Sequence, residues 1–219
     1  MSCNQCIGVE EEFNPAIARR QLKRYIRRGP KRTTAWLIRA ILDRGLAEPS
    51  LLDIGGGVGE IQHELAASGA GTVTSVDASS AYLEQSKREA ERRGYRGRAT
   101  YWFAGFTDVH DEIDAADVVT LDRVICCFDN VDDLVGRSVA KAKRLYGLVY
   151  PRESWWTALG FRSINLVQRL RRAHFRVYLH PSERVDAMIT RAGFKSVFHR
   201  NSFLWQVVLY EAVVGREAG

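Results

Sequence analysis

One aspartate and four glycines lie in one short stretch of the chain, Asp53-Ile54-Gly55-Gly56-Gly57-Val58-Gly59. Glycine has no Cβ, so a turn built from it lets the backbone approach a bound group closely. A second carboxylate, Asp77, follows Gly57 by about 20 positions, which is near the spacing at which an acidic residue meets the two ribose hydroxyls of a nucleotide. These residue types at this spacing indicate a nucleotide-binding corner.

The elements that must position these residues follow from the apolar pattern. Residues 51–54 read as a short buried strand, 60–67 as a helix, and 72–77 as a second strand that ends at Asp77. Further strands are expected at 99–103, 116–122, 145–152, 195–199 and 204–210, and further helices at 15–28, 33–44, 80–93 and 182–192. This alternation predicts an α/β fold with a mostly parallel sheet. The short connection at 200–202 makes the final strand antiparallel.

The glycine frame distinguishes between nucleotides. The dinucleotide fingerprint G-x-G-x-x-G/A fails, because Glu60 or Gln62 stands at its last position, and this disfavours a nicotinamide enzyme. An acidic residue followed by G-x-G-x-G resembles the first motif of the class I S-adenosylmethionine-dependent methyltransferases, and the resemblance covers about residues 50–150. It implies a Rossmann-like fold, with a seven-stranded, mostly parallel sheet whose last strand is antiparallel, and S-adenosylmethionine as cofactor. The alternative is a structural glycine turn in another α/β protein.

The resemblance also implies a set of cofactor contacts beyond the carboxyl ends of the strands, where open α/β sheets bind ligands. The expected residues are Asp53, Gly55, Gly56, Gly57, Gly59, Asp77, Ala78, Phe106, Asp122, Arg123 and Val124. Relatives often read Gly-Asp-Phe where this chain reads Ala104-Gly105-Phe106, so the aspartate for the adenine amino group is absent and Phe106 is left to stack on the ring. For Asp77 alone, the alternative is an N-cap for the helical run that starts at Ser79.

The acceptor side of the site is less specific in the sequence. Asp122, at the end of a continuous apolar strand, is the first candidate for a catalytic proton acceptor, which is needed only if the acceptor must lose a proton. His174, His180 and Tyr25 are weaker candidates. Expected substrate contacts are Tyr25, Arg152, Trp155 and Trp156.

Residues 153–176 interleave tryptophan and aliphatic side chains with arginines. Three interpretations remain open: a wall of the acceptor pocket for an apolar, anionic acceptor, an interfacial helix on membrane lipids, or packing of the apolar residues in the core. The strand at 116–122, its continuation to residue 128 and the strand at 145–152 also resemble the branch near the magnesium-protoporphyrin methyltransferases.

Composition and length limit the domain organisation and the location that can be expected. A chain of 219 residues with 46% hydrophobic and 26% charged residues suits a single domain, here divided into an N-terminal helical cover (1–47, not independent) and a methyltransferase domain (48–219). No apolar run approaches the roughly 20 residues that span a bilayer, and no signal peptide is recognisable, so we expect a cytoplasmic protein. Residues 1–14 show no periodicity and are expected to be loosely ordered. Cys3 and Cys6 form only half of a zinc site, so no metal is expected.

The net charge of +6 is concentrated in residues 19–44 and 152–176. Basic segments of this kind suit nucleic acid, an anionic membrane surface or an acidic small molecule. The function predicted is methyl transfer to a small-molecule acceptor that is apolar and anionic. Nucleic acid is disfavoured and peripheral membrane contact stays open. The alternative is a methyltransferase-fold binding module without catalysis, or an RNA-binding methyltransferase that uses the basic helices.

Overall fold

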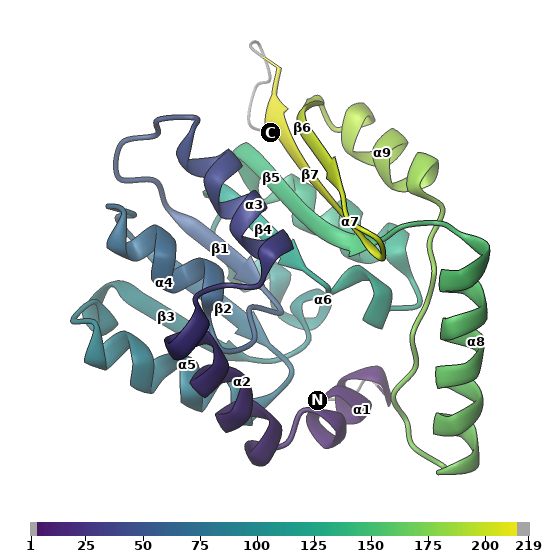
Figure 1. Ribbon diagram of the computed structural model, residues 1–219. Helices are drawn as coiled ribbons and strands as arrows, with labels where there is room; N and C mark the ends of the chain where they lie inside the picture. Colours follow the sequence, from purple (N-terminus) through teal and green to yellow (C-terminus); the bar gives the residue numbers. More distant parts are fainter. Residues whose placement is uncertain (1–3, 214–219) are drawn as a thin grey trace.

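The computed structural model describes residues 4–213, whose strands form one seven-stranded sheet in the order β3-β2-β1-β4-β5-β7-β6 (Figure 1). The strands are β1 (Leu51–Ile54), β2 (Val73–Asp77), β3 (Ala99–Phe103), β4 (Ala116–Asp122), β5 (Ala142–Pro151), β6 (Phe194–Asn201) and β7 (Trp205–Ala212). Strands β1 to β5 pair in parallel, whereas β7 runs antiparallel to both β5 and β6. The predicted mostly parallel sheet with an antiparallel last strand is confirmed.

Helices connect and cover these strands. The α-helices of the described residues are α1 (Asn4–Glu12), α2 (Pro15–Arg28), α3 (Arg32–Leu42), α4 (Glu60–Ala67), α5 (Ser80–Arg92), α6 (Phe106–Val109), α7 (Val131–Ala140), α8 (Trp155–Leu170) and α9 (Ser182–Arg191). Helix α2 begins and ends as the sequence predicts: the Asn14 side chain accepts the amides of Ala16 and Ile17, and Gly29 ends the helix at a φ of 71°.

The sheet separates two hydrophobic cores because neighbouring strand residues point to opposite faces. On one face α3, α4 and α5 pack over Leu51 and Val118. On the other face α7 and α9 pack over Leu52 and Val119. Strand β4 is therefore buried on both sides, as its continuous apolar run predicts.

Helix α3 belongs to this core although it precedes the first strand. Its Leu37 is fully buried, and a Cβ at Gly147 of β5 would lie only 2.8 Å from Leu37 Cδ1. The absence of a side chain at Gly147 thus lets α3 approach the sheet closely. The division of the chain at residue 47 stays a prediction.

The expectation of loose order before residue 14 is wrong for the residues that the structure describes. Helix α1 packs so closely on the segment after α8 that a Cβ at Gly8 would lie 2.5 Å from the Phe175 backbone nitrogen. Phe13, just after α1, stacks on Tyr82 with ring centroids 5.2 Å apart. Cys6 is buried, whereas Cys3 lies outside the described residues. A helix this short shows too few turns for its periodicity to be recognised.

Two further interpretations of the sequence need correction. One is that the serine at the start of the helix expected at 182–192 caps it, and the other is that the apolar residues of the segment 153–176 pack in the core. Ser182 does not cap α9: it is the first helical residue, after Pro181 at the N-cap, and its hydroxyl accepts the Gln206 amide. The apolar residues of α8 are not core residues, because Thr157 and Gln168 are the buried residues of that helix. Helix α8 lies at the side of the molecule, away from the sheet (Figure 1). Within residues 4–213, the helices are too short or too polar to cross a membrane.

The packing of α3 predicts a large stability effect at Leu37. Leu37→Ala should lower the free energy of unfolding by roughly 2–5 kcal/mol, because it leaves a cavity between α3 and the sheet. Leu42→Ala on the same helix is the matched control, since Leu42 is 39% exposed, and should cost less than about 1 kcal/mol. Urea denaturation measures both variants. Equal losses would contradict the assignment of α3 to the core.

Candidate functional site

The turn between β1 and α4 depends on glycine at consecutive positions. Gly55, Gly57 and Gly59 have φ values of 63°, 57° and 84°, a region that favours glycine. At Gly56 a Cβ would collide with the Asp53 carboxylate and the Gln62 amide, which fill the space beneath the turn. The glycines are thus required both by the direction of the backbone and by what lies under it.

A buried hydrogen-bond network supports the turn from below. Asp53 is 1% exposed, and its two carboxylate oxygens accept Thr120 Oγ1 at 2.6 Å and Gln62 Nε2 at 3.0 Å. The same Gln62 nitrogen donates to Ser75 Oγ, and Gln62 Oε1 accepts Ser86 Oγ. Burial raises the pKa of Asp53 to about 7, although the bonds from Thr120 and Gln62 favour the carboxylate.

Asp77 ends β2 directly beside the glycine turn. Its Oδ2 accepts the amide of Gly57 at 2.9 Å and its Oδ1 accepts the amide of Ser79 at 2.8 Å. Burial raises its pKa to about 6. Each carboxylate oxygen has lone pairs to spare for a further donor such as a hydroxyl. The N-cap of α5 is Ser79, so Asp77 is not the cap of that helix.

These residues surround a cavity of about 300 Å³ at the carboxyl ends of β1, β2 and β4. The expected cofactor residues that line it are Asp53, Gly55, Gly56, Gly57, Asp77, Ala78, Phe106, Asp122, Arg123 and Val124. Gly59 does not line it. Gly59 is instead the N-cap of α4, where a Cβ would lie 2.7 Å from His63 Nε2.

Residues from the N-terminal helices also line the cavity, and sequence analysis does not identify them. They are Cys6 and Val9 of α1, Phe13, Gln21 of α2, and Lys31 before α3. Their amino-acid types carry no motif, and it is tertiary packing that brings them to the glycine turn. The only local signal is Asn14-Pro15, which marks the start of α2 but not the direction of the segment before it.

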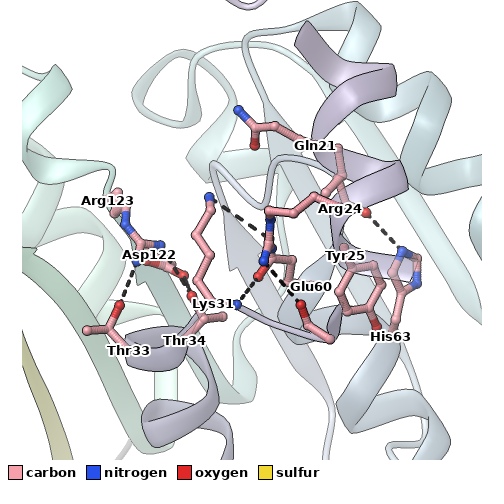
Figure 2. Close-up of polar contacts among 12 residues, drawn as sticks. Gln21, Arg24, Tyr25, Lys31, Thr33, Thr34, Glu60, His63, Asp122 and Arg123 are labelled. Carbon is pink, nitrogen blue, oxygen red and sulfur yellow. Dashed lines mark hydrogen bonds and ion pairs between the residues drawn. The ribbon is translucent and has the colours of Figure 1, made fainter. Parts of the chain in front are cut away.

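Glu60 fastens the N-terminal helices to the first turn of α4. This carboxylate is 7% exposed and accepts Arg24 of α2 and the backbone amide of Lys31, the latter at 2.8 Å. Lys31 Nζ lies 3.9 Å from the same carboxylate. Burial lowers the pKa of Lys31, and the nearby Arg123 guanidinium lowers it further. Figure 2 shows Lys31 between the Arg24–Glu60 pair and the Asp122–Arg123 pair.

Asp122 and Arg123 form an ion pair where β4 ends. Asp122 Oδ1 accepts Arg123 Nη1 at 2.7 Å and its Oδ2 accepts Thr34 Oγ1 at 2.5 Å (Figure 2). Arg123 also donates to Thr33 Oγ1 and lies over the Trp205 ring, 4.8 Å from its centroid. Burial raises the pKa of Asp122, while Arg123 opposes this shift. The pair presents a cation and a proton acceptor on one wall of the cavity.

The expected substrate contacts lie elsewhere. Tyr25 is 1% exposed and its hydroxyl donates to Glu64 at 2.5 Å. Arg152 donates to the Ser202 carbonyl, and Trp155 and Trp156 are on the exposed side of α8. None of these four residues lines the cavity.

The two histidines named as weaker catalytic candidates also have other partners. His174 lies 3.2 Å from the Glu11 carboxylate, and His180 Nε2 lies 2.8 Å from the Phe128 carbonyl.

Comparison with known proteins finds one match to a family model and several solved structures of similar fold. The family model of the methyltransferase domain matches residues 51–145, from the start of β1 into β5. No curated protein matches the chain. The magnesium protoporphyrin IX methyltransferase of Synechocystis PCC 6803, solved with bound SAH, superposes with a TM-score of 0.73 at 16% identity over 96% of this chain and 100% of that chain.

Two other solved structures are similar. An O-methyltransferase family protein from Burkholderia thailandensis has a TM-score of 0.70 at 15% identity over 95% of this chain and 64% of that one. The geranyl diphosphate C-methyltransferase of Streptomyces coelicolor A3(2) has a TM-score of 0.62 at 12% identity, covering 82% and 77%. At these identities the likeness concerns the fold. The expected resemblance is confirmed: residues 51–145 match the family model of the methyltransferase domain, and the chain has the fold of the class I S-adenosylmethionine-dependent methyltransferases.

Proposed function

We propose that this chain transfers a methyl group from S-adenosylmethionine to a small-molecule acceptor that is apolar and anionic. The observation that carries the proposal is the cavity between the glycine turn and Asp77, because it is lined by a backbone without side chains and by a buried carboxylate. At Gly57 no atom lies within 4 Å of where a Cβ would be, so the turn leaves space for a ligand.

The residues present fit the cofactor. Asp77 would accept the ribose hydroxyls, Phe106 would contact the adenine, and the turn with Asp53 would hold the methionine end and its ammonium group. When bound, S-adenosylmethionine supplies a methyl carbon already activated by the sulfonium. The chain's own task is then to orient the acceptor and to exclude water.

The N-terminal helices suit that task. Cys6, Val9 and Phe13 place mostly apolar atoms on the cavity wall, which keeps the reacting region poor in water. Asp122 is our candidate to hold a proton lost by the acceptor, because its raised pKa makes the carboxylate a better base. A carboxylate or thiolate acceptor would not need it.

The acceptor class is proposed from the wall that Lys31 and Arg123 share with Val124, Phe128 and Leu134. Two neighbouring cations, one of them with a lowered pKa, are stabilised when an anion binds between them. The apolar neighbours would contact the rest of the acceptor. Of the similar structures, the geranyl diphosphate C-methyltransferase was solved with geranyl diphosphate, a ligand that joins an apolar chain to an anionic group.

Gly57→Leu should weaken cofactor binding at least tenfold, and Gly45→Leu is its matched control. Both glycines have similar φ values, 57° and 63°, with open space around the Cβ position, so both variants carry a similar backbone strain of about 1–2 kcal/mol. Of these two glycines, Gly57 lines the cavity and Gly45 does not. Calorimetric titration with S-adenosylhomocysteine should show at least a tenfold loss for Gly57→Leu alone. Unchanged affinity in a folded Gly57→Leu protein would exclude the proposed site.

Cofactor affinity should rise from about pH 6 to about pH 8. In the ligand-free protein the raised pKa of Asp53, about 7, leaves much of the group protonated at pH 6. An ammonium group beside it favours the carboxylate, so binding releases a proton and strengthens as that proton is lost. Titrations in two buffers of different ionisation enthalpy measure the release.

Asp53→Asn should remove most of this pH dependence and weaken binding at pH 8 roughly tenfold, the range for a lost charge-assisted hydrogen bond. Its thermal unfolding is recorded as the control for folding. If the slope of affinity against pH is the same in both proteins, another group binds the ammonium.

Lys31→Gln tests the acceptor class. We expect release of S-adenosylhomocysteine with ring-bearing carboxylic acids but not with their neutral amides, and a rise in KM for the acids of roughly tenfold in Lys31→Gln. Lys23→Gln, on the exposed side of α2, is the control. A loss of cofactor affinity instead would place Lys31 on the cofactor. Cofactor binding without turnover on any acceptor would favour a binding module.

A further inference from the structure

Helix α8 turns an apolar side toward solvent. Trp155, Leu159, Leu166 and Leu170 are 74%, 56%, 58% and 76% exposed, and their spacing places them on one stripe of the helix. An amphipathic helix normally buries such a stripe against its own domain. Here the opposite side of α8, with Thr157 and Gln168, is the buried one.

The stripe continues onto a second element. Trp156 stacks on Phe203 of the β6–β7 connection, with centroids 5.7 Å apart and ring planes 13° from parallel. Phe203 is itself 74% exposed. We call Trp155, Trp156, Leu159, Leu166, Leu170 and Phe203 the α8 surface. Because two elements of the fold contribute to it, its geometry is held in place rather than left to one helix.

Contacts on the buried side fix the orientation of α8. Gln168 Nε2 donates to Glu12 of α1 at 3.1 Å, and Asn165 pairs with the backbone of Val177 through both its amide oxygen and nitrogen. Rotating the helix to bury the α8 surface would break these hydrogen bonds. The apolar stripe therefore stays outward in the folded chain.

Helix α8 and the segment that follows it are basic in sequence. From residue 154 to residue 182 the chain has arginines at 162, 169, 171, 172 and 176 and no aspartate or glutamate. Arg162 and Arg169 are exposed on the helix, and Arg171 and Arg172 are exposed directly after it. An exposed apolar stripe bordered by arginines, with tryptophan at its end, is the composition of a helix that lies in a membrane interface.

We propose that α8 docks this protein on an anionic lipid membrane, with the α8 surface inserted among the acyl chains and the arginines on the lipid headgroups. A second copy of the chain is the less suitable occupant, because its arginines would face those of the first. Anionic lipid complements them instead. This binding surface is separate from the proposed cofactor cavity and is present whether or not the chain transfers methyl groups.

Vesicle binding tests the proposal. Vesicles of phosphatidylcholine alone are compared with vesicles that also contain phosphatidylglycerol, by co-sedimentation and tryptophan emission. We expect binding and a blue shift with the anionic vesicles, and weakening of both in high salt. Replacing Leu159 and Leu170 by serine should abolish binding. Arg162→Gln with Arg169→Gln should weaken it by roughly fivefold for each arginine.

The control for net charge is Arg19→Gln with Arg20→Gln on the exposed side of α2, which should leave binding close to that of the wild type. An equal loss in this control would show nonspecific attraction and overturn the docking role of α8. Failure of the wild-type protein to bind anionic vesicles would also overturn the docking role. A wild-type dimer that dissociates when Leu159 and Leu170 are replaced would overturn it as well, because a second copy would then cover the α8 surface. The comparison of neutral with anionic vesicles, made with the wild-type protein, tests the proposal even if a variant does not fold. Titration with S-adenosylhomocysteine, unchanged in the α8 variants, separates this result from the proposed function.

Discussion

A single buried carboxylate, that of Asp53, connects most of the elements around the glycine turn. Through Thr120 it reaches β4, and through Gln62 it reaches α4, β2 and α5, so five elements meet in one hydrogen-bond network. Buried polar groups are costly unless each finds a partner, and here each partner is on a different element. The network occupies the space beneath the turn and so excludes a side chain at Gly56. The shape of the cavity along the glycine turn follows from this one arrangement.

The part of the cavity wall that the N-terminal helices form depends on a different set of contacts. Glu60 holds α2 and the segment before α3, while Thr33 and Thr34 reach across to the Asp122–Arg123 pair. The helices that precede the sheet in sequence therefore complete the site formed at the ends of its strands. This also explains why the family match, which begins at β1, leaves out part of the cavity wall.

What the sequence predicts well is local. The alternation of strands and helices, the glycine turn and the residues at the strand ends all depend on short patterns, and the structure places ten of the expected cofactor residues on one cavity. Residues such as Lys31 and Gln21 escape prediction because only tertiary packing brings them there. Helix α8 shows a second limit: its apolar stripe is visible in sequence, but periodicity does not say whether a stripe faces the core or the solvent.

Arg123 is one of the few residues other than glycine with a positive φ, 63°, in the described chain. Backbone in that region is strained by about 1–2 kcal/mol for a residue with a Cβ, and the hydrogen bonds to Thr33 and Asp122 hold the residue in it. Glycine or asparagine at this position would relax the backbone, but either would leave the largely buried Asp122 carboxylate without its ion-pair partner. The backbone strain at Arg123 is therefore the smaller of two costs, and it accompanies a cation held on the cavity wall.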